Sequence, residues 1–144
     1  MSRILSIDYG RKYIGLAVTC ESQIAISNLT ALKYHKKDFW DSFFKILKEY
    51  SPKEIIIGVP LLDDREPTLL TEIENFSKHI KKNIPEINII LWDESLSSVD
   101  AEIIYSQKTG KYAQSSKKIN KKKEEIHSLS AHLILRSYLD RISH

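Results

Sequence analysis

The stretch RILSIDYGRKYIGLA, residues 3–17, decides the fold of this protein. An apolar run ends on Asp8, the turn signal Tyr9-Gly10 follows, and a second apolar run begins at Ile14. Glycine accepts the positive φ that a hairpin turn needs, and Ile and Tyr favour strand positions. The pattern therefore predicts a strand, a tight turn and a second strand.

Asp8 is the first candidate functional residue, because it is expected at the outward end of a buried strand. A carboxylate at such a place is costly to bury alone, so it should be paired, hydrogen-bonded or bound to a metal cation. The alternative is that Asp8 only initiates the turn, as aspartate commonly does. These residues alone leave both interpretations open.

The composition sets the broad class of protein. A chain of 144 residues predicts one domain, 1–144, with a proper hydrophobic core. Cys20 is the only cysteine, so it cannot form an intramolecular disulfide and is expected to be a small buried hydrophobe. No apolar run is long enough for a membrane span, and the N-terminal segment is strand-like, which predicts a soluble, cytoplasmic protein without a membrane partner. A net charge of +3 says little about partners by itself.

The rest of the chain predicts an α/β protein. Three antiparallel strands in a meander come first, and two further strands alternate with helices, which implies right-handed crossovers and parallel pairing. The expected architecture is a mixed five-stranded sheet, three antiparallel strands then two parallel ones, flanked by helices. The expected strands are 4–8, 13–19, 23–30, 54–59 and 87–92, and the expected helices are 38–50, 68–83, 97–106 and 124–142.

Asp93 and Glu94 directly follow the last predicted strand. Ligands and catalytic groups of open α/β sheets gather beyond the carboxyl ends of parallel strands, so this pair and Asp8 are expected to meet there. Either residue could instead be a carboxylate at a helix entry, favoured by the helix dipole. Two strand ends that both present acids favour a metal site.

A lysine-rich segment, residues 108–123, has very few apolar residues and predicts a mobile loop. Such a run is most often a solvated surface. Beside an acidic metal site, however, a cationic loop suits a polyanionic substrate, because lysines attract phosphates without reading sequence. The candidate nucleic-acid-binding residues are Lys12, Lys111, Lys117, Lys118, Lys121 and Lys122.

His127 lies near the start of the last predicted helix. It is expected on the apolar face of that helix, which could simply make it a satisfied core histidine. If this helix end reaches the rim that carries Asp8, the imidazole could bind a metal, position a water or move a proton. The other predicted members of the face are Ala131, Ile134, Leu135, Tyr138 and Ile142.

Four motifs, in order along the chain, resemble the YqgF family. They are DYGRKYIGLA (8–17), IGVPL (57–61), WDESLSSVDA (92–101) and IHSLSAHLILRSYL (126–139). That family comprises small bacterial ribonuclease H-like proteins described as Holliday-junction resolvases and as pre-16S rRNA nucleases. The resemblance covers nearly the whole chain, and it implies a ribonuclease H-like fold.

The resemblance also implies an acidic site. Asp8, Asp93 and Glu94 match the family's acidic residues, whereas His127 stands where the family has a third carboxylate. Ser95 replaces a usual arginine, and Leu62 and Arg65 also depart from the family pattern. An imidazole suits Mn²⁺ better than Mg²⁺, so the departures imply an altered site with Mg²⁺ or Mn²⁺ as cofactor.

The predicted function is metal-dependent hydrolysis of phosphodiester bonds in structured nucleic acid, either pre-16S rRNA at its 5′ end during ribosome biogenesis or branched DNA. Asp8, Glu94 and His127 would hold the metal, and Asp93 would support them. One alternative is a nucleic-acid-binding protein of the same fold with impaired hydrolysis. Another is an ATP-binding domain of the kinase or actin type, which needs two lobes and a longer chain. The sequence leaves open whether the protein is a monomer or a homodimer.

Overall fold

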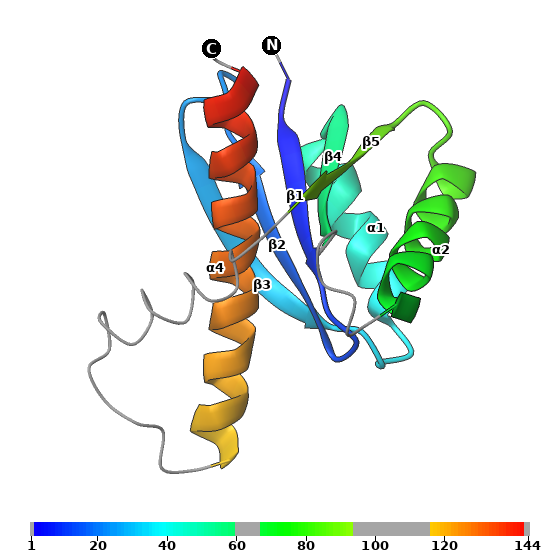
Figure 1. The fold of residues 1–144 in the computed structure, drawn as a ribbon, viewed down its shortest axis with the longest axis vertical. Helices are drawn as coiled ribbons and strands as arrows, with labels where there is room; N and C mark the ends of the chain where they lie inside the picture. The colour runs from blue at the N-terminus through cyan, green and yellow to red at the C-terminus, as the bar shows by residue number, and fades with distance from the viewer. Residues whose placement is uncertain (1, 60–66, 94–115, 143–144) are drawn as a thin grey trace.

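The computed structural model describes residues 2–59, 67–93 and 116–142, without the side chains of 67 and 116–122. A central sheet has α1 and α2 on one face and α4 on the other (Figure 1). In the described part of the chain, no helix is long and apolar enough to cross a membrane. The elements are β1 (Ile4–Tyr9), β2 (Tyr13–Thr19), β3 (Ile26–Lys33), α1 (Phe39–Tyr50), β4 (Glu54–Val59), α2 (Pro67–Asn83), β5 (Asn88–Asp93) and α4 (Ser116–Ile142).

The five strands form one mixed sheet in the order β3-β2-β1-β4-β5. β1 pairs antiparallel with β2, and β2 antiparallel with β3, whereas β4 runs parallel to both β1 and β5. The predicted fold class is therefore confirmed. The first strand lies at the centre of the sheet, and Asp8 is level with Gly15 of β2 and Gly58 of β4.

β1 and β2 are buried along their whole length because helices cover both faces of the sheet at these strands. Alternate residues of a strand point to opposite faces, so each strand contributes to both cores. Leu5 and Ile7 join the core beneath α1 and α2, which contains the fully buried Phe43. Ile4 joins the smaller core beneath α4 with Leu135.

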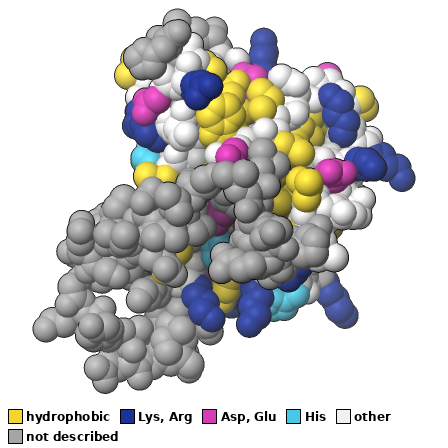
Figure 2. Space-filling model, in the orientation of Figure 1, with side chains coloured by type: hydrophobic (Ala, Val, Ile, Leu, Met, Phe, Trp, Pro, Cys, Tyr) yellow, Lys and Arg dark blue, Asp and Glu magenta, His cyan; other side chains and the backbone are white. Residues whose placement is uncertain are grey.

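The α4 face of the sheet is only partly covered by described elements. α4 lies against β3, β2 and β1 and reaches β4 only at its edge. Hydrophobic side chains gather on the surface beside this helix (Figure 2). The half-buried Ile90 and Trp92 of β5 pack against the core beneath α4 from this side.

The last helix differs from its prediction. α4 begins at Ser116, so residues 116–123, predicted as part of a loop, are helical, and residues 108–115 lie outside the described part. Lysine is a good helix former, so a lysine-rich segment can extend a helix without an apolar face. Ile142 is 51% exposed, and Leu139, one turn after Leu135, is buried in the core beneath α4 instead.

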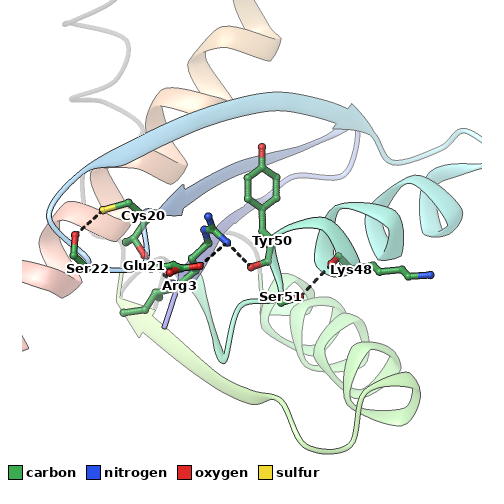
Figure 3. A network of polar contacts seen from close by, with 9 residues as sticks. Arg3, Cys20, Glu21, Ser22, Lys48, Tyr50 and Ser51 are labelled. Atoms are coloured by element: carbon green, nitrogen blue, oxygen red, sulfur yellow. Dashed lines mark hydrogen bonds and ion pairs between the residues drawn. The ribbon is translucent and has the colours of Figure 1, made fainter. Parts of the chain in front are cut away.

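The turn between β2 and β3 also differs from its prediction. β3 begins at Ile26 rather than at residue 23, because residues 21–24 form a turn that the backbone bond from Cys20 N–H to the Ala25 carbonyl closes at 3.0 Å. Gln23 adopts a positive φ of 64° in this turn. The expectation of a buried Cys20 is wrong, since its side chain is partly exposed beside Ser22 (Figure 3).

The Cys20 thiol is expected to be reactive at neutral pH. The Ser22 side chain, 3.1 Å from the sulfur, and the backbone N–H of Ala25 lower the pKa of Cys20 to about 6. Because the thiolate is the reactive form, alkylation by iodoacetamide should increase as pH rises through about 6, and Ser22→Ala should move the midpoint upward. Mass spectrometry of labelling between about pH 5 and 9 checks this; a wild-type midpoint near the ordinary value of about 8.5 would contradict it.

Candidate active site

Asp8 is held at the end of β1 with its side chain on the α4 face. Ser6, two residues earlier on the same face, donates a hydrogen bond of 2.6 Å to the carbonyl of Ala131 in α4. This bond fixes α4 against β1 two residues before Asp8. Asp8 is only 3% exposed, so its carboxylate needs a partner.

His127 supplies that partner from the other end of the sequence. Its Nδ1 lies 2.7 Å from Oδ2 of Asp8, and its side chain is 29% exposed. In the neutral tautomer with its proton on Nδ1, that N–H donates to the carboxylate and the lone pair of the imidazole is on Nε2. The structure thus brings together two of the predicted site residues, one buried and one that reaches the surface.

Two glycines allow α4 to approach the sheet here. A Cβ on Gly15 would lie 2.1 Å from the carbonyl oxygen of His127, and one on Gly10 would lie 2.9 Å from Cε1 of its ring. Both distances are too short for any real side chain. The sequence interpretation gave Gly15 no role, although a glycine inside a strand is a known signal of close backbone approach.

Tyr13 is a further neighbour that the sequence interpretation missed. Its ring centroid lies 5.8 Å from that of His127, at an interplanar angle of 32°. Tyr13 begins β2 and is itself largely buried. The ring therefore restricts the imidazole on one side, and the backbone of Gly10 lies close to Cε1 on another, where a Cβ would be only 2.9 Å away.

Asp93 is not brought to this pair. Its neighbour Trp92 faces α4, where Nε1 donates a 3.2 Å hydrogen bond to Ser137. Asp93 is level with Val59, whose side chain belongs to the core beneath α1 and α2, so its exposed carboxylate is directed to the face opposite Asp8.

The other predicted residues differ in how far the structure describes them. Lys12 is exposed in the turn between β1 and β2. The helical backbone of α4 includes Lys117, Lys118, Lys121 and Lys122, whose side chains are not described. Glu94, Ser95, Leu62, Arg65 and Lys111 lie outside the described residues altogether.

The donors present fit part of a divalent-cation site. Within residues 2–59, 67–93 and 123–142, no three His, Cys, Asp or Glu side chains gather around a common point. Asp8 and His127 offer one carboxylate and one imidazole, a donor set that Mn²⁺ accepts better than Mg²⁺ does. A histidine that binds a metal commonly donates its other N–H to a carboxylate, as Nδ1 does here.

The strand order, and the aspartate on the central strand facing the last helix, define the class of protein: the fold is ribonuclease H-like. A crystal structure of the Fowlpox virus resolvase with Holliday junction DNA has this fold, with a TM-score of 0.59 and 18% identity over 97% of this chain and 98% of the viral one. The profile of the RuvX family, described as Holliday junction resolvase, matches residues 2–141, and this chain belongs to that family.

Curated relatives match almost end to end. A protein of Bacteroides fragilis named "Putative pre-16S rRNA nuclease" is 36% identical over 141 residues, with 97% of each chain covered. A protein of the same name from a Sulfurihydrogenibium species is 38% identical, over 99% of this chain and 93% of its own. Family membership leaves the kinase or actin alternative without support.

Proposed function

We propose that this protein is a metal-dependent endonuclease that hydrolyses phosphodiester bonds in structured nucleic acid, with the 5′ end of pre-16S rRNA as its substrate. The observation that carries the proposal is the 2.7 Å contact between Asp8 and His127 at the carboxyl end of the central strand. The names of the relatives favour a precursor of 16S ribosomal RNA as substrate. In this proposal the processing takes place in the cytoplasm during ribosome biogenesis. Holliday junction DNA, in the family description, is the second substrate to test.

In this proposal Asp8, Glu94 and His127 hold a divalent cation, Mg²⁺ or Mn²⁺. When bound, such an ion supplies Lewis-acid stabilisation of the phosphate and a more acidic water nucleophile. Asp8 uses Oδ2 to orient the imidazole of His127. That contact points Nε2 away from Asp8, so with the contact closed Nε2 would direct a water, and His127 would reach a cation held by Asp8 only if its ring turned. Asp93 adds negative charge at the end of β5.

The groups packed around the imidazole fix its orientation. Tyr13 packs beside the ring, and Gly10, which has no side chain, lets its backbone lie close to Cε1. A ring held on both sides needs little reordering when substrate binds, so it can direct a water or a proton along one line. These residues prepare the site before any ligand arrives.

The metal requirement is tested by cleavage of a 5′-labelled pre-16S rRNA fragment. Because one donor is an imidazole, we expect cleavage with Mn²⁺ to be about tenfold faster than with Mg²⁺, and cleavage to stop when EDTA removes the ion. His127→Asp should reverse the preference toward Mg²⁺, since a carboxylate replaces the nitrogen donor. Glu74→Gln, an exposed acid on α2, is the matched control and should behave like wild type.

A second candidate function is nucleic-acid binding without hydrolysis. The presence of His127 where the resemblance implies a carboxylate favours it, because fewer negative ligands bind a divalent ion less tightly. Cleavage in neither metal, of either the RNA fragment or a four-way DNA junction, together with tight binding of one of them, would replace the nuclease proposal by this one.

A further inference from the structure

Four lysines lie in the turn between β1 and β2 or in the segment after β3 that is hydrogen-bonded to it, and we call them the hairpin lysine cluster. Lys12 is in the turn itself, Lys33 is the last residue of β3, and Lys36 and Lys37 follow in the connection to α1. Three of them are exposed and Lys33 is half-buried. Of these four lysines, only Lys12 was expected from the sequence to bind nucleic acid.

The backbone holds these lysines on one surface. The N–H of Tyr34 donates a 2.8 Å hydrogen bond to the carbonyl of Lys12, which ties the connection after β3 to the turn. A second bond, 3.3 Å from Lys36 N–H to the Lys33 carbonyl, folds the connection back on itself. Lys and Arg side chains are gathered along the lower edge of the described surface (Figure 2), which is the end of the molecule where the β1–β2 turn lies in Figure 1.

The charges of the cluster are not neutralised by ion pairs with the described residues. Arg11, directly before Lys12, is different, because it forms an ion pair with Glu72 at 2.7 Å. Asp38 and Glu124 line a hollow of about 310 Å³ with Lys33 and Lys36, but neither is within ion-pair distance of them. Positive charges gathered without ion pairs to the described residues repel one another and attract a polyanion.

The cluster lies next to the Asp8–His127 pair. Lys33 is level with Tyr13 across the β2–β3 pairing, so both side chains are on the α4 face. Tyr13 in turn packs against His127. Neighbouring strands are about 4.8 Å apart, so the cluster begins one strand away from the ring that contacts the imidazole.

We propose that the hairpin lysine cluster binds the phosphate backbone of the substrate on the β3 side of the site, so that the phosphodiester at Asp8 and His127 is reached from that side. This inference deepens the proposed function and rests on it. Lysines contact phosphates as point charges and read no bases, so the surface supplies affinity and position for a structured RNA or a DNA branch alike.

The test compares two triple variants in an Asp8→Asn background that prevents cleavage. Lys33→Gln/Lys36→Gln/Lys37→Gln removes three charges of the cluster, and Lys45→Gln/Lys78→Gln/Lys82→Gln removes three exposed charges from α1 and α2. Fluorescence anisotropy with a labelled pre-16S rRNA fragment, between about 50 and 300 mM KCl, gives the salt dependence of binding. For the cluster variant we expect the slope of log K against log salt to fall by about 2, and affinity to fall about tenfold or more, with the control near wild type.

Equal losses in the two variants, or no change in the slope of the cluster variant, would overturn the inference. In the background with Asp8 restored, the cluster variant should raise KM about tenfold and leave kcat within about twofold, because lost phosphate contacts weaken ground-state and transition-state binding equally. If wild type does not cleave in Mn²⁺ but the salt slope depends on the cluster, the nuclease proposal fails and the binding surface stands.

Discussion

Replacing Asp8 by asparagine is expected to lower the rate of phosphodiester cleavage by about 10³-fold, with little change in the fold. The carboxylate is the only acid described next to His127, and removing its charge takes away a proposed cation ligand and weakens the hydrogen bond that orients the imidazole. The loss of one preorganised electrostatic group in an enclosed site typically costs about 10²–10³ in kcat. Here one substitution removes one such contribution and weakens a second.

Asparagine has nearly the size of aspartate, and its amide can still hydrogen-bond to Nδ1 of His127. The variant should therefore unfold in urea close to the wild-type midpoint, which separates loss of chemistry from loss of structure. Cleavage of the labelled pre-16S rRNA fragment in Mn²⁺ is the measurement, with Glu74→Gln as the control. A variant that keeps more than about a tenth of wild-type activity would remove Asp8 from the mechanism, because that exceeds what a lost electrostatic group allows.

Gly15→Ala is expected to lower the free energy of unfolding by about 3 kcal/mol, the upper end for overpacked sites. The added methyl carbon would lie 2.1 Å from the carbonyl oxygen of His127 and 2.4 Å from its carbonyl carbon. Both are backbone atoms, so no side-chain rotation relieves the contact. α4 must instead withdraw from β2, which loosens the core beneath it and moves the imidazole away from Asp8.

Urea unfolding followed by tryptophan fluorescence measures this loss, since Trp92 packs against Tyr138 of α4 and Trp40 packs on the opposite face of the sheet. Ser27→Ala, on the exposed edge strand β3, is the control and should change stability by less than about 0.5 kcal/mol. Wild-type stability in Gly15→Ala would show that α4 can retreat without cost. In that case the close approach of helix and strand would not be needed for folding.

The periodicity of the sequence was enough for most of the fold. Strand β4 was predicted with its observed bounds, Glu54–Val59, because a continuous apolar run between two prolines has few other solutions. Errors occurred where local signals were weak. The turn after Cys20 depends on a positive φ at Gln23, and glutamine is not a residue that predicts this conformation. The start of α4 lies in a lysine-rich segment without an apolar face.

For the candidate site, the sequence singled out Asp8 and His127 separately, each with an ordinary structural role as an alternative. Their hydrogen bond joins residues 119 positions apart, and no local pattern encodes such a contact. Tyr13 and Gly15 were missed for the same reason, since their importance lies in what packs against them. Asp93 illustrates the opposite case: its acidity was visible, but the face to which it points was not.

The sequence by itself determined the mixed five-stranded sheet, the place of Asp8 at the end of a buried strand and the family to which the chain belongs, because alternation, chain order and motifs are local properties. Only the tertiary structure decided that His127 contacts Asp8, that Asp93 faces away from both and that four lysines share one surface. These facts depend on strand register and on how closely α4 packs on the sheet. Both are set by contacts between residues that are distant in the chain.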